Sequence, residues 1–307
     1  MNKKIRKFWN NPLLLLIALG HRGYFNWMSD RAYLKMIYFI KMGKRLDIDN
    51  PQTFNEKLQW MKLYDRNPEY TRMVDKYEAK RYVADVLGEE YVIPTLGVWN
   101  RPEDIDFDSL PNQYVLKTTH DSGGVILCHD NLSFEKGAAI NKLSKCLKHN
   151  FYWGMREWPY KDVKPRIIAE KYMKEDKGTD LKDYKFFCFD GVVKMFKVDF
   201  DRFVCHRANY YDREGNFLPF GEVAYPFDKS KVIDIPPNFD RMVEFAEKLS
   251  KRIPFVRIDF YNVNGRIYFG EITFYPASGF GKLSSEEWDM TIGSWIKINN
   301  NKRSCIK

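Results

Sequence analysis

The stretch that decides the fold lies near the end of the chain: Val256-Arg257-Ile258-Asp259-Phe260, a short turn around Asn264-Gly265, and Gly270-Glu271-Ile272-Thr273. Both apolar segments alternate in the manner of β-strands, and each places charged or polar side chains on one face. Such charges are costly within a sheet unless a ligand, a metal or an ion pair offsets them. The stretch therefore predicts a charged hairpin that binds a ligand. The open alternative is a cross-strand Arg–Glu pair beside a solvated aspartate.

The turn decides whether the carboxylates of Asp259 and Glu271 share a face. A two-residue Asn-Gly loop would pair Asp259 with Gly270 and place Glu271 on the opposite side. A three-residue loop, Val263-Asn264-Gly265 with its glycine left-handed, would pair Arg257 with Glu271 and leave Asp259 diagonal to it. We favour the three-residue loop, because it gathers two carboxylates where divalent cations could bridge phosphates.

Size and charge set the class of protein. With 307 residues, 44% of them hydrophobic and 30% charged, the chain can form a large core, and we expect two lobes rather than one. The net charge of +9 is concentrated in residues 1–50, which contain ten Lys/Arg and three Asp/Glu. A basic N-terminus favours an anionic membrane surface or a polyanionic substrate, although a plain solvated surface explains it too.

Cysteine usage and the N-terminus bear on location. Five cysteines without a CxxC pair are typical of reduced thiols in a cytoplasmic protein. The apolar run 13–19 follows four cations, but it is too short to span a bilayer and no cleavage site of small residues follows. We predict a docked helix in a cytoplasmic protein, with peripheral contact at the inner face of the cell membrane left open.

The order of elements predicts an α+β fold with helices over mainly antiparallel sheets. Capping boxes predict helix starts at Thr53-Glu56 and Asp75-Glu78, and residues 1–50 look helical. Further helices are expected at 134–147 and 239–249, and an extended connection at 93–99. Strands are expected at 114–119, 125–128, 166–172, 185–189 and 192–199, with Asp190-Gly191 as a hairpin turn between the last two.

A glycine-rich segment, Asp121-Ser122-Gly123-Gly124, lies between two predicted strands, so it is neither a P-loop nor a dinucleotide fingerprint. A hairpin tip with free backbone N–H groups can still fold over phosphates, and Lys117 just before it can supply a point charge. Taken alone, the same residues fit an ordinary turn beside a surface lysine. The sequence contains no HExxH motif, which argues against a zinc site, and no G-x-S-x-G motif, which argues against a serine nucleophile. No nucleic-acid-binding module is recognisable, so we predict no nucleic-acid partner.

Together these segments resemble the ATP-grasp superfamily and, more narrowly, its TupA-like branch, related to the teichuronopeptide biosynthesis protein. The resemblance covers about residues 20–290 and rests on 53–60, 75–77, 114–117, 122–124, 168–172, 183–186 and the 257–271 hairpin. It implies two α/β lobes with mainly antiparallel sheets that hold ATP between them. We expect a basic helical region at 1–66, a smaller lobe at 67–170 and a larger lobe at 171–300.

The resemblance also implies roles for individual residues. Lys76 and Lys117 would contact the phosphates of ATP, and Ser122, Gly123 and Gly124 would form the mobile loop that closes over them. The adenine link would include Glu170, Lys171 and Met173, with Asp180 or Asp176 at the ribose.

The hairpin would supply the metal site. Asp259 and Glu271 would bind Mg²⁺, and Arg257, with Lys117, would act in catalysis by stabilising the transferred phosphate or an acyl-phosphate. Many superfamily members have Asn two residues after the second carboxylate, whereas this chain has Thr273. A hydroxyl can still coordinate Mg²⁺ or a water molecule.

The expected function is an ATP-dependent carboxylate–amine ligase of bacterial surface (capsular or cell-wall) polysaccharide biosynthesis, which forms an amide through an acyl-phosphate. Its substrates would be a carboxylate-bearing glycan or sugar and an amine, either an amino acid or an amino sugar. Trp153, Trp158 and Tyr160 fit sugar stacking or core packing equally well. Two alternatives remain: a glycosyltransferase, for which Asp199-Phe200-Asp201 is the sole DxD match, and a non-catalytic nucleotide-binding protein.

Overall fold

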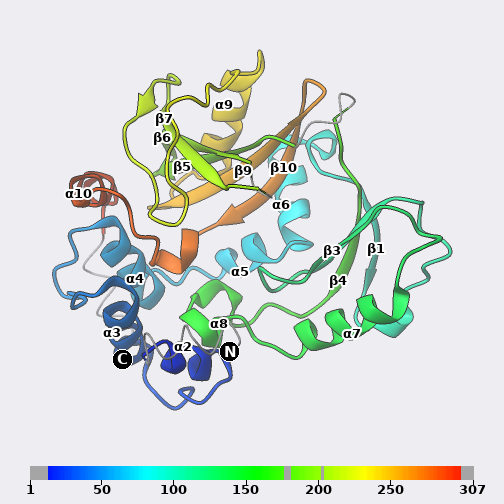
Figure 1. The fold of residues 1–307 in the computed structure, drawn as a ribbon, viewed down its shortest axis with the longest axis horizontal. Helices are drawn as coiled ribbons and strands as arrows, with labels where there is room; N and C mark the ends of the chain where they lie inside the picture. Colours follow the sequence, from blue (N-terminus) through cyan, green and yellow to red (C-terminus); the bar gives the residue numbers. More distant parts are fainter. Residues whose placement is uncertain (1–12, 176–180, 202–203, 299–307) are drawn as a thin grey trace.

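Two antiparallel sheets and a group of N-terminal helices make up the molecule (Figure 1). The structure is a computed structural model that describes residues 13–175, 181–201 and 204–298. The predicted α+β architecture with mainly antiparallel sheets is confirmed. The boundaries at residues 66 and 170 stay predictions. The described residues contain no helix of sufficient length and apolar character to span a bilayer.

The N-terminal helices are α2 (Leu13–His21), α3 (Asp30–Met42), α4 (Phe54–Tyr64), α5 (Glu69–Val74) and α6 (Glu78–Leu87). Among them, α3 and α4 begin at residues whose side chains cap them, Ser29 and Thr53. At α4 the predicted capping box forms, since the Thr53 hydroxyl accepts from Glu56 N–H and the Glu56 carboxylate accepts from Thr53 N–H (3.1 Å). At α6 only half of the predicted box forms. Asp75 accepts from the N–H groups of Tyr77 and Glu78, whereas the Glu78 side chain binds Arg166 instead.

The smaller sheet has the strand order β1-β4-β2-β3. Its strands are β1 (Thr95–Trp99), β2 (Tyr114–Thr118), β3 (Val125–Cys128) and β4 (Ile167–Lys171), and α7 (Lys136–Leu147) covers one face. Leu116 on β2 and Leu143 on α7 belong to one buried apolar cluster on that face. The opposite face carries Lys117 and Glu170, because side chains alternate along a strand. The segment predicted as an extended connection contributes β1, paired with β4.

The larger sheet has the order β10-β9-β5-β6-β7-β8. Its strands are β5 (Asp183–Phe189), β6 (Val192–Phe200), β7 (Arg207–Asp212), β8 (Phe217–Leu218), β9 (Val256–Val263) and β10 (Arg266–Thr273). The predicted Asp190-Gly191 turn joins β5 to β6, and both residues have positive φ (51° and 82°). Helix α9 (Phe239–Leu249) covers one face, where the Phe239 ring lies 4.8 Å from that of Phe196.

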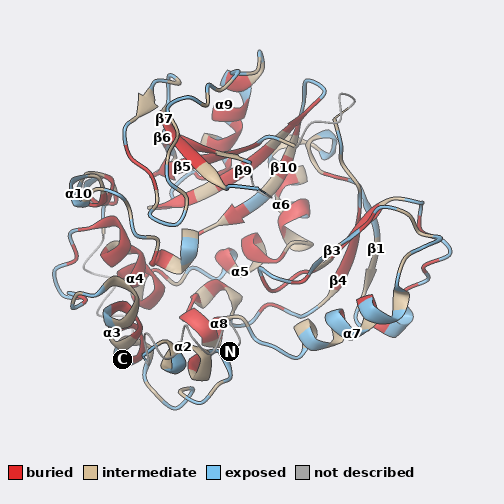
Figure 2. Ribbon diagram, viewed as in Figure 1, coloured by how far each residue is buried: buried red, intermediate tan, exposed pale blue. Residues whose placement is uncertain are grey.

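Short elements link these layers: η1 (Glu89–Tyr91), η2 (Pro102–Asp104), α8 (Tyr152–Met155), η3 (Trp158–Tyr160), η4 (Pro276–Gly279) and α10 (Glu286–Trp295). The N-terminal helices share one core with the larger sheet, and Figure 2 shows buried residues along α4, α9 and the strands between them. The Phe54 ring of α4 meets Phe255 edge-on at 5.0 Å. The helices and the larger sheet therefore form one packed body.

The hairpin between β9 and β10 corrects the predicted register. Its tip is the two-residue turn Asn264-Gly265, with φ of 50° and 78°, so the predicted three-residue loop is wrong. The pairing nevertheless shifts at Gly270: Phe269 lies opposite Phe260, and Glu271 lies opposite Asp259. A two-residue turn alone would place the side chains of Asp259 and Glu271 on opposite faces of the sheet. The β-bulge adds one residue to β10 and so returns both side chains to the same face.

Glycine suits the bulge for a steric reason. A Cβ at Gly270 would lie 3.0 Å from the Asp259 carbonyl oxygen, closer than side-chain carbons normally approach. Because of the shift, Arg257 is paired with Thr273, and not with Glu271 as predicted.

Candidate active site

A small cavity lies between the two sheets. Its wall includes side chains from both lobes: Lys76, Lys80, Lys117, Asp121, Ser122, Tyr160, Glu170 and Glu271. The cavity measures about 40 Å³, far less than the roughly 300–1,000 Å³ of sites that hold small molecules. A nucleotide can therefore enter only when the glycine-rich loop or a lobe moves.

The buried Lys80 and the half-buried Lys117 share one carboxylate. Glu170, on β4, contacts Lys117 Nζ at 2.5 Å and Lys80 Nζ at 2.6 Å. Burial raises the pKa of Glu170, but the two ammonium groups outweigh this effect and hold the pKa below its usual range. Lys80 also donates to the Ile93 carbonyl (2.7 Å), which ties α6 to the start of β1. The three side chains form a fixed cationic wall.

Lys76 lies at the turn that precedes α6 and reaches the glycine-rich loop. Its Nζ donates to the backbone carbonyls of Thr118 (3.1 Å) and Asp121. Burial lowers the pKa of Lys76, and the nearby carboxylates of Asp121 and Glu271 oppose that effect. Phosphate oxygens could replace these two carbonyl oxygens as hydrogen-bond acceptors for Lys76.

Asp121 organises the glycine-rich loop. Its carboxylate accepts from the Thr118 hydroxyl (2.6 Å) and from the backbone N–H of Gly124 (3.1 Å). Gly124 is buried in this loop, whereas Ser122 and Gly123 are exposed at its tip. The predicted hairpin tip is thus present between β2 and β3, and the buried Asp121 carboxylate stabilises its conformation.

The charged hairpin faces the lysines across the cavity. Arg257 holds both oxygens of Asp259 at 2.7 Å, and its Nη2 also reaches Glu271 (2.6 Å) and the Thr273 hydroxyl (3.1 Å). Asp259 is 1% exposed, whereas the Glu271 side chain is 51% exposed at the cavity. Three oxygen-bearing side chains therefore gather around one guanidinium.

This arrangement perturbs the ionisation of the buried acid. Burial raises the pKa of Asp259 to about 7, against the lowering effect of Arg257. For Arg257, burial acts to lower the pKa, but the carboxylates of Asp259 and Glu271 raise the pKa by more, so the guanidinium stays charged. A cation at this position would favour the ionised form of Asp259.

Further charges continue across the larger sheet on the same face. Lys185 on β5 is paired with Asp259 on one side and with Lys197 of β6 on the other. Lys185 Nζ contacts Asp183 and lies 2.8 Å from Asp199. The face next to the hairpin is thus a buried network of alternating charges.

The remaining predicted residues lie at or near the link after β4. Lys171 ends β4 with an exposed side chain, and its N–H donates to Pro94 O (3.0 Å); Met173 is half-buried. Asp176 and Asp180 lie outside the described residues. The adenine and ribose roles therefore stay predictions. Glu170 points its carboxylate at the lysines, so any adenine contact would come from its backbone.

Sequence reasoning missed Lys80, Asp121 and Lys185. Lys80 lies four residues after Lys76, next to apolar Ala79 and Val83 on the buried side of α6. Lys185 and Asp183 alternate with aromatic residues on a fully buried strand. A charge on an otherwise apolar face is the signal that could have found the two lysines, Lys80 and Lys185.

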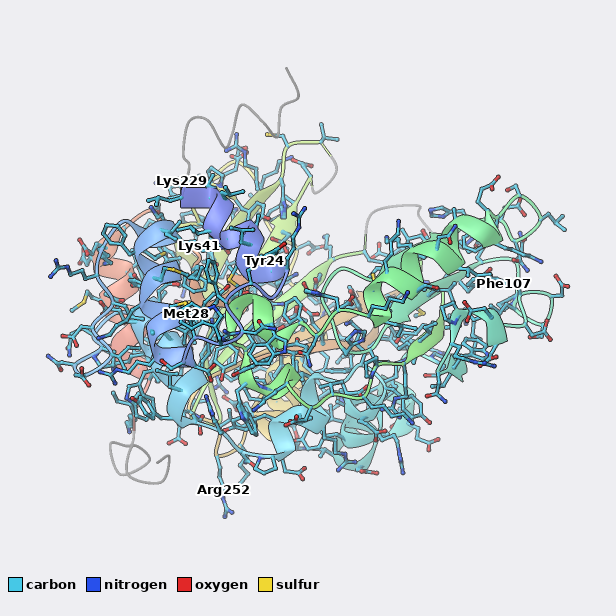
Figure 3. All side chains as sticks on the ribbon, turned by 90° about the horizontal axis from the view of Figure 1, so that it is seen from below. Tyr24, Met28, Lys41, Phe107, Lys229 and Arg252 are labelled. Atoms are coloured by element: carbon cyan, nitrogen blue, oxygen red, sulfur yellow. The ribbon has the colours of Figure 1, made fainter. Side chains whose placement is uncertain are left out.

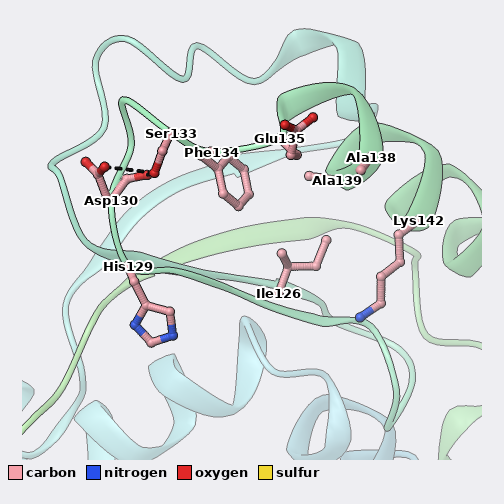
Figure 4. Close-up of a pocket in the computed structure, with 9 residues that line it drawn as sticks. All are labelled: Ile126, His129, Asp130, Ser133, Phe134, Glu135, Ala138, Ala139 and Lys142. Atoms are coloured by element: carbon pink, nitrogen blue, oxygen red, sulfur yellow. Dashed lines mark hydrogen bonds between the residues drawn. The ribbon is translucent and has the colours of Figure 1, made fainter.

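A wider cavity of about 390 Å³ lies elsewhere, on the smaller lobe (Figure 4). Its lining includes Ile126, Phe134 and Lys142. Ile126 is paired with Leu116, so it points to the α7 face of the sheet, opposite Lys117. This cavity therefore cannot receive a group held by Lys117 and Glu271.

Comparison with known families decides the assignment. The model of the TupA-like ATP-grasp family matches residues 56–297. The chain belongs to the TupA-like ATP-grasp family. The match spans the cationic wall, the glycine-rich loop and the charged hairpin, and it confirms the resemblance read from the sequence. No curated protein matches the chain.

Solved structures similar to this TupA-like protein include several ligases. D-alanine–D-alanine ligase from Bacillus anthracis, complexed with ATP, shares 17% identity over 66% of this chain and 53% of that one, with a TM-score of 0.39. The Helicobacter pylori ligase shares 13% identity over 81% and 70% (TM-score 0.43). Biotin carboxylase from Campylobacter jejuni shares 16% over 79% and 47% (TM-score 0.41). The chain spans about half the length of the first of these.

Asp259, Glu271 and Thr273 present oxygen donors of the kind that Mg²⁺ prefers, and in this structure the Arg257 guanidinium contacts all three. Among the described residues, no group of three or more His, Cys, Asp or Glu side chains is arranged to hold a metal ion. Asp259 and Glu271 are directly opposite each other, and the Thr273 hydroxyl donates to Glu271 (3.2 Å) rather than turning away. Two carboxylates are sufficient for Mg²⁺ when a ligand supplies phosphate oxygens.

Proposed function

We propose that this protein is an ATP-dependent carboxylate–amine ligase. The observation that carries the proposal is the meeting of two sets of side chains at one cavity. Lys117 lies on the smaller sheet and Lys76 at the turn before α6, and the hairpin with Arg257 and Glu271 belongs to the larger sheet. Membership in the TupA-like ATP-grasp family supports ATP as the nucleotide.

The lysines would bind the phosphates. Lys76 exchanges its bonds to the Thr118 and Asp121 carbonyls for phosphate oxygens when the loop opens and closes. Lys117 would contact the phosphates, and Glu170, which contacts both lysines, would stay paired with Lys80. Asp259, Glu271 and Thr273 would hold Mg²⁺, which neutralises phosphate charge when bound.

The reaction would proceed in two transfers. The substrate carboxylate attacks the γ-phosphorus, ADP leaves, and an acyl-phosphate forms. The amine then attacks the acyl carbon and loses a proton, inorganic phosphate leaves, and an amide remains. Arg257, which contacts Glu271 at the cavity, would stabilise the transferred phosphoryl group, and closure of the loop would keep water from the acyl-phosphate.

The proposed acceptor is a carboxylate-bearing glycan or sugar of a bacterial capsular or cell-wall polysaccharide, joined to an amino acid or amino sugar. Tyr160 supports an acceptor next to the phosphates, because it lines the cavity. Trp158 is half-buried beside it. Trp153 is less suited to stacking on a sugar, since the Arg156 guanidinium already lies 4.6 Å from its ring.

The test is a coupled assay with ATP, Mg²⁺ and libraries of sugar acids and amines. We expect ADP and phosphate to be released together with an amide product detected by mass spectrometry. Asp259→Asn should lose about 100-fold or more in turnover, since removing one such electrostatic contact costs about 3–4 kcal/mol. Asp240→Asn, on the exposed side of α9, is the matched control and should retain activity.

Three outcomes would overturn the proposal. Near-normal phosphate release by Asp259→Asn would remove the hairpin from the mechanism. Release of nucleoside diphosphate from a nucleotide sugar without ATP would indicate a glycosyltransferase. ATP binding with no turnover across the libraries would indicate a nucleotide-binding protein.

A further inference from the structure

Helix α2 and the turn after it expose large apolar side chains. Leu15 is 51% exposed, Tyr24 63% and Trp27 81%. These fractions are high for side chains of this size, and the three residues lie within thirteen positions of the chain. Exposed apolar groups clustered in this way mark an interaction surface rather than scattered surface residues.

The segment is held firmly, so the exposure does not come from a loose chain end. Trp27 Nε1 donates to Tyr24 O (3.0 Å), and the buried Arg156 donates to Phe25 O (2.8 Å). The Tyr33 hydroxyl donates to Gly154 O (2.8 Å), which joins α3 to α8. The turn thus buries Phe25 toward the core while it presents Tyr24 and Trp27 outward.

Charge on this segment has one sign. Residues 1–29 contain five Lys/Arg and no Asp or Glu. The first acid, Asp30, is 19% exposed and faces inward, where it contacts Arg66 (2.7 Å) and the Tyr152 hydroxyl. The sequence around this apolar surface is therefore cationic, and its first acid is already engaged by Arg66 and Tyr152.

We propose that α2 and the turn at residues 22–28 form a docking surface for an anionic lipid bilayer. Tyrosine and tryptophan are the side chains that favour the membrane–water interface, and each nearby cation adds attraction to anionic headgroups. The described helix α2 has nine residues, so it would lie at the interface. Figure 3 looks onto this side of the molecule and labels Tyr24 near α2.

The surface lies close to the candidate active site. Helix α2 packs on α8, since a Cβ at Gly154 would approach the His21 ring. The chain runs from α8 directly into η3, whose Tyr160 lines the cavity between the sheets. Docking would hold the active site beside the bilayer. The inference does not depend on the ligase assignment.

The test is vesicle co-sedimentation of the full chain. We expect binding to vesicles of phosphatidylcholine with phosphatidylglycerol, weak binding to phosphatidylcholine alone, and weaker binding at high salt. Tyr24→Ser/Trp27→Ser should reduce binding by about tenfold or more, as should replacing Lys3, Lys4, Arg6 and Lys7 with Gln. Leu132→Ser is the matched control, since Leu132 is 97% exposed on the smaller lobe. Its binding should equal that of the wild type.

Circular dichroism and thermal unfolding would verify that each variant remains folded. Equal binding of Tyr24→Ser/Trp27→Ser and wild type to anionic vesicles would overturn the inference, and so would a wild type that remains in the supernatant. Concentration-dependent dimerisation that the same double variant abolishes, without vesicle binding by the wild type, would assign the surface to a second copy of the chain instead.

Discussion

Replacing Gly124 with alanine tests whether the glycine-rich loop closes over phosphates. Gly124 donates its N–H to Asp121 and accepts from Thr118 N–H (2.9 Å). A Cβ on Gly124 would overlap the Thr118 hydroxyl and lie 3.0 Å from the Asp121 carboxylate. Gly123, next to it, has nothing within 4 Å of the same position, so it provides a matched control.

The size of the effect follows from these contacts. Overpacking a closed site costs about 1–3 kcal/mol. Loss of the charge-assisted hydrogen bond between Thr118 and Asp121 costs a further 1.5–3 kcal/mol, roughly. We expect a bound ligand to hold the loop in the arrangement seen here, in which Gly124 is buried, whereas the free loop can open and avoid most of this cost. About 3 kcal/mol against the closed state corresponds to roughly 100-fold weaker nucleotide binding.

Calorimetric titration with Mg²⁺ and a non-hydrolysable ATP analogue measures this directly. Gly124→Ala should weaken the Kd by the amount above, and Gly123→Ala should leave it unchanged. Equal Kd values for Gly124→Ala and the wild type, or equal losses in both variants, would refute the role of the loop.

Three more predictions concern the wall, the hairpin and the packing. Glu170→Gln leaves the buried Lys80 and the half-buried Lys117 without a carboxylate, and urea unfolding should show a loss of about 3–5 kcal/mol; Lys80→Met/Glu170→Leu should lose less. Burial raises the pKa of Asp259 to about 7, and Mg²⁺ binds the ionised form of a carboxylate. Calorimetric titrations with nucleotide and Mg²⁺ should therefore show affinity that weakens as the pH falls through 7. Asp259→Asn should lack this pH dependence. Gly293→Ala, whose Cβ would overlap the backbone before α4, should cost about 1–3 kcal/mol in thermal unfolding, whereas Gly137→Ala on α7 should be neutral or stabilising.

Local sequence patterns predicted most elements well, because periodicity and caps act within a few residues. Helix α9 begins and ends where its apolar spacing predicts, and strand β3 does as well. The strand Thr95–Trp99 lacks a clear alternation and gains its pairing only from β4, more than sixty residues later. Such a strand depends on contacts that no local pattern shows.

The site shows the same division. That Asp259 and Glu271 share a face was predicted, but through the wrong turn, since the sequence does not say where an extra residue enters a hairpin. The bulge at Gly270 depends on a close approach to the Asp259 backbone. Likewise, nothing near Lys80 in the sequence indicates that it shares Glu170 with Lys117.

The sharing of Glu170 by Lys80 and Lys117 also bears on selectivity against small anions. A cleft lined by bare ammonium groups would concentrate sulfate, free phosphate and metabolite carboxylates from the surrounding solution. Here the resting cations already have a counter-ion fixed at 2.5–2.6 Å, so a monovalent or weakly held anion gains little by displacing it. Only a polyvalent chain of phosphates, anchored at several points at once, competes effectively with a built-in partner.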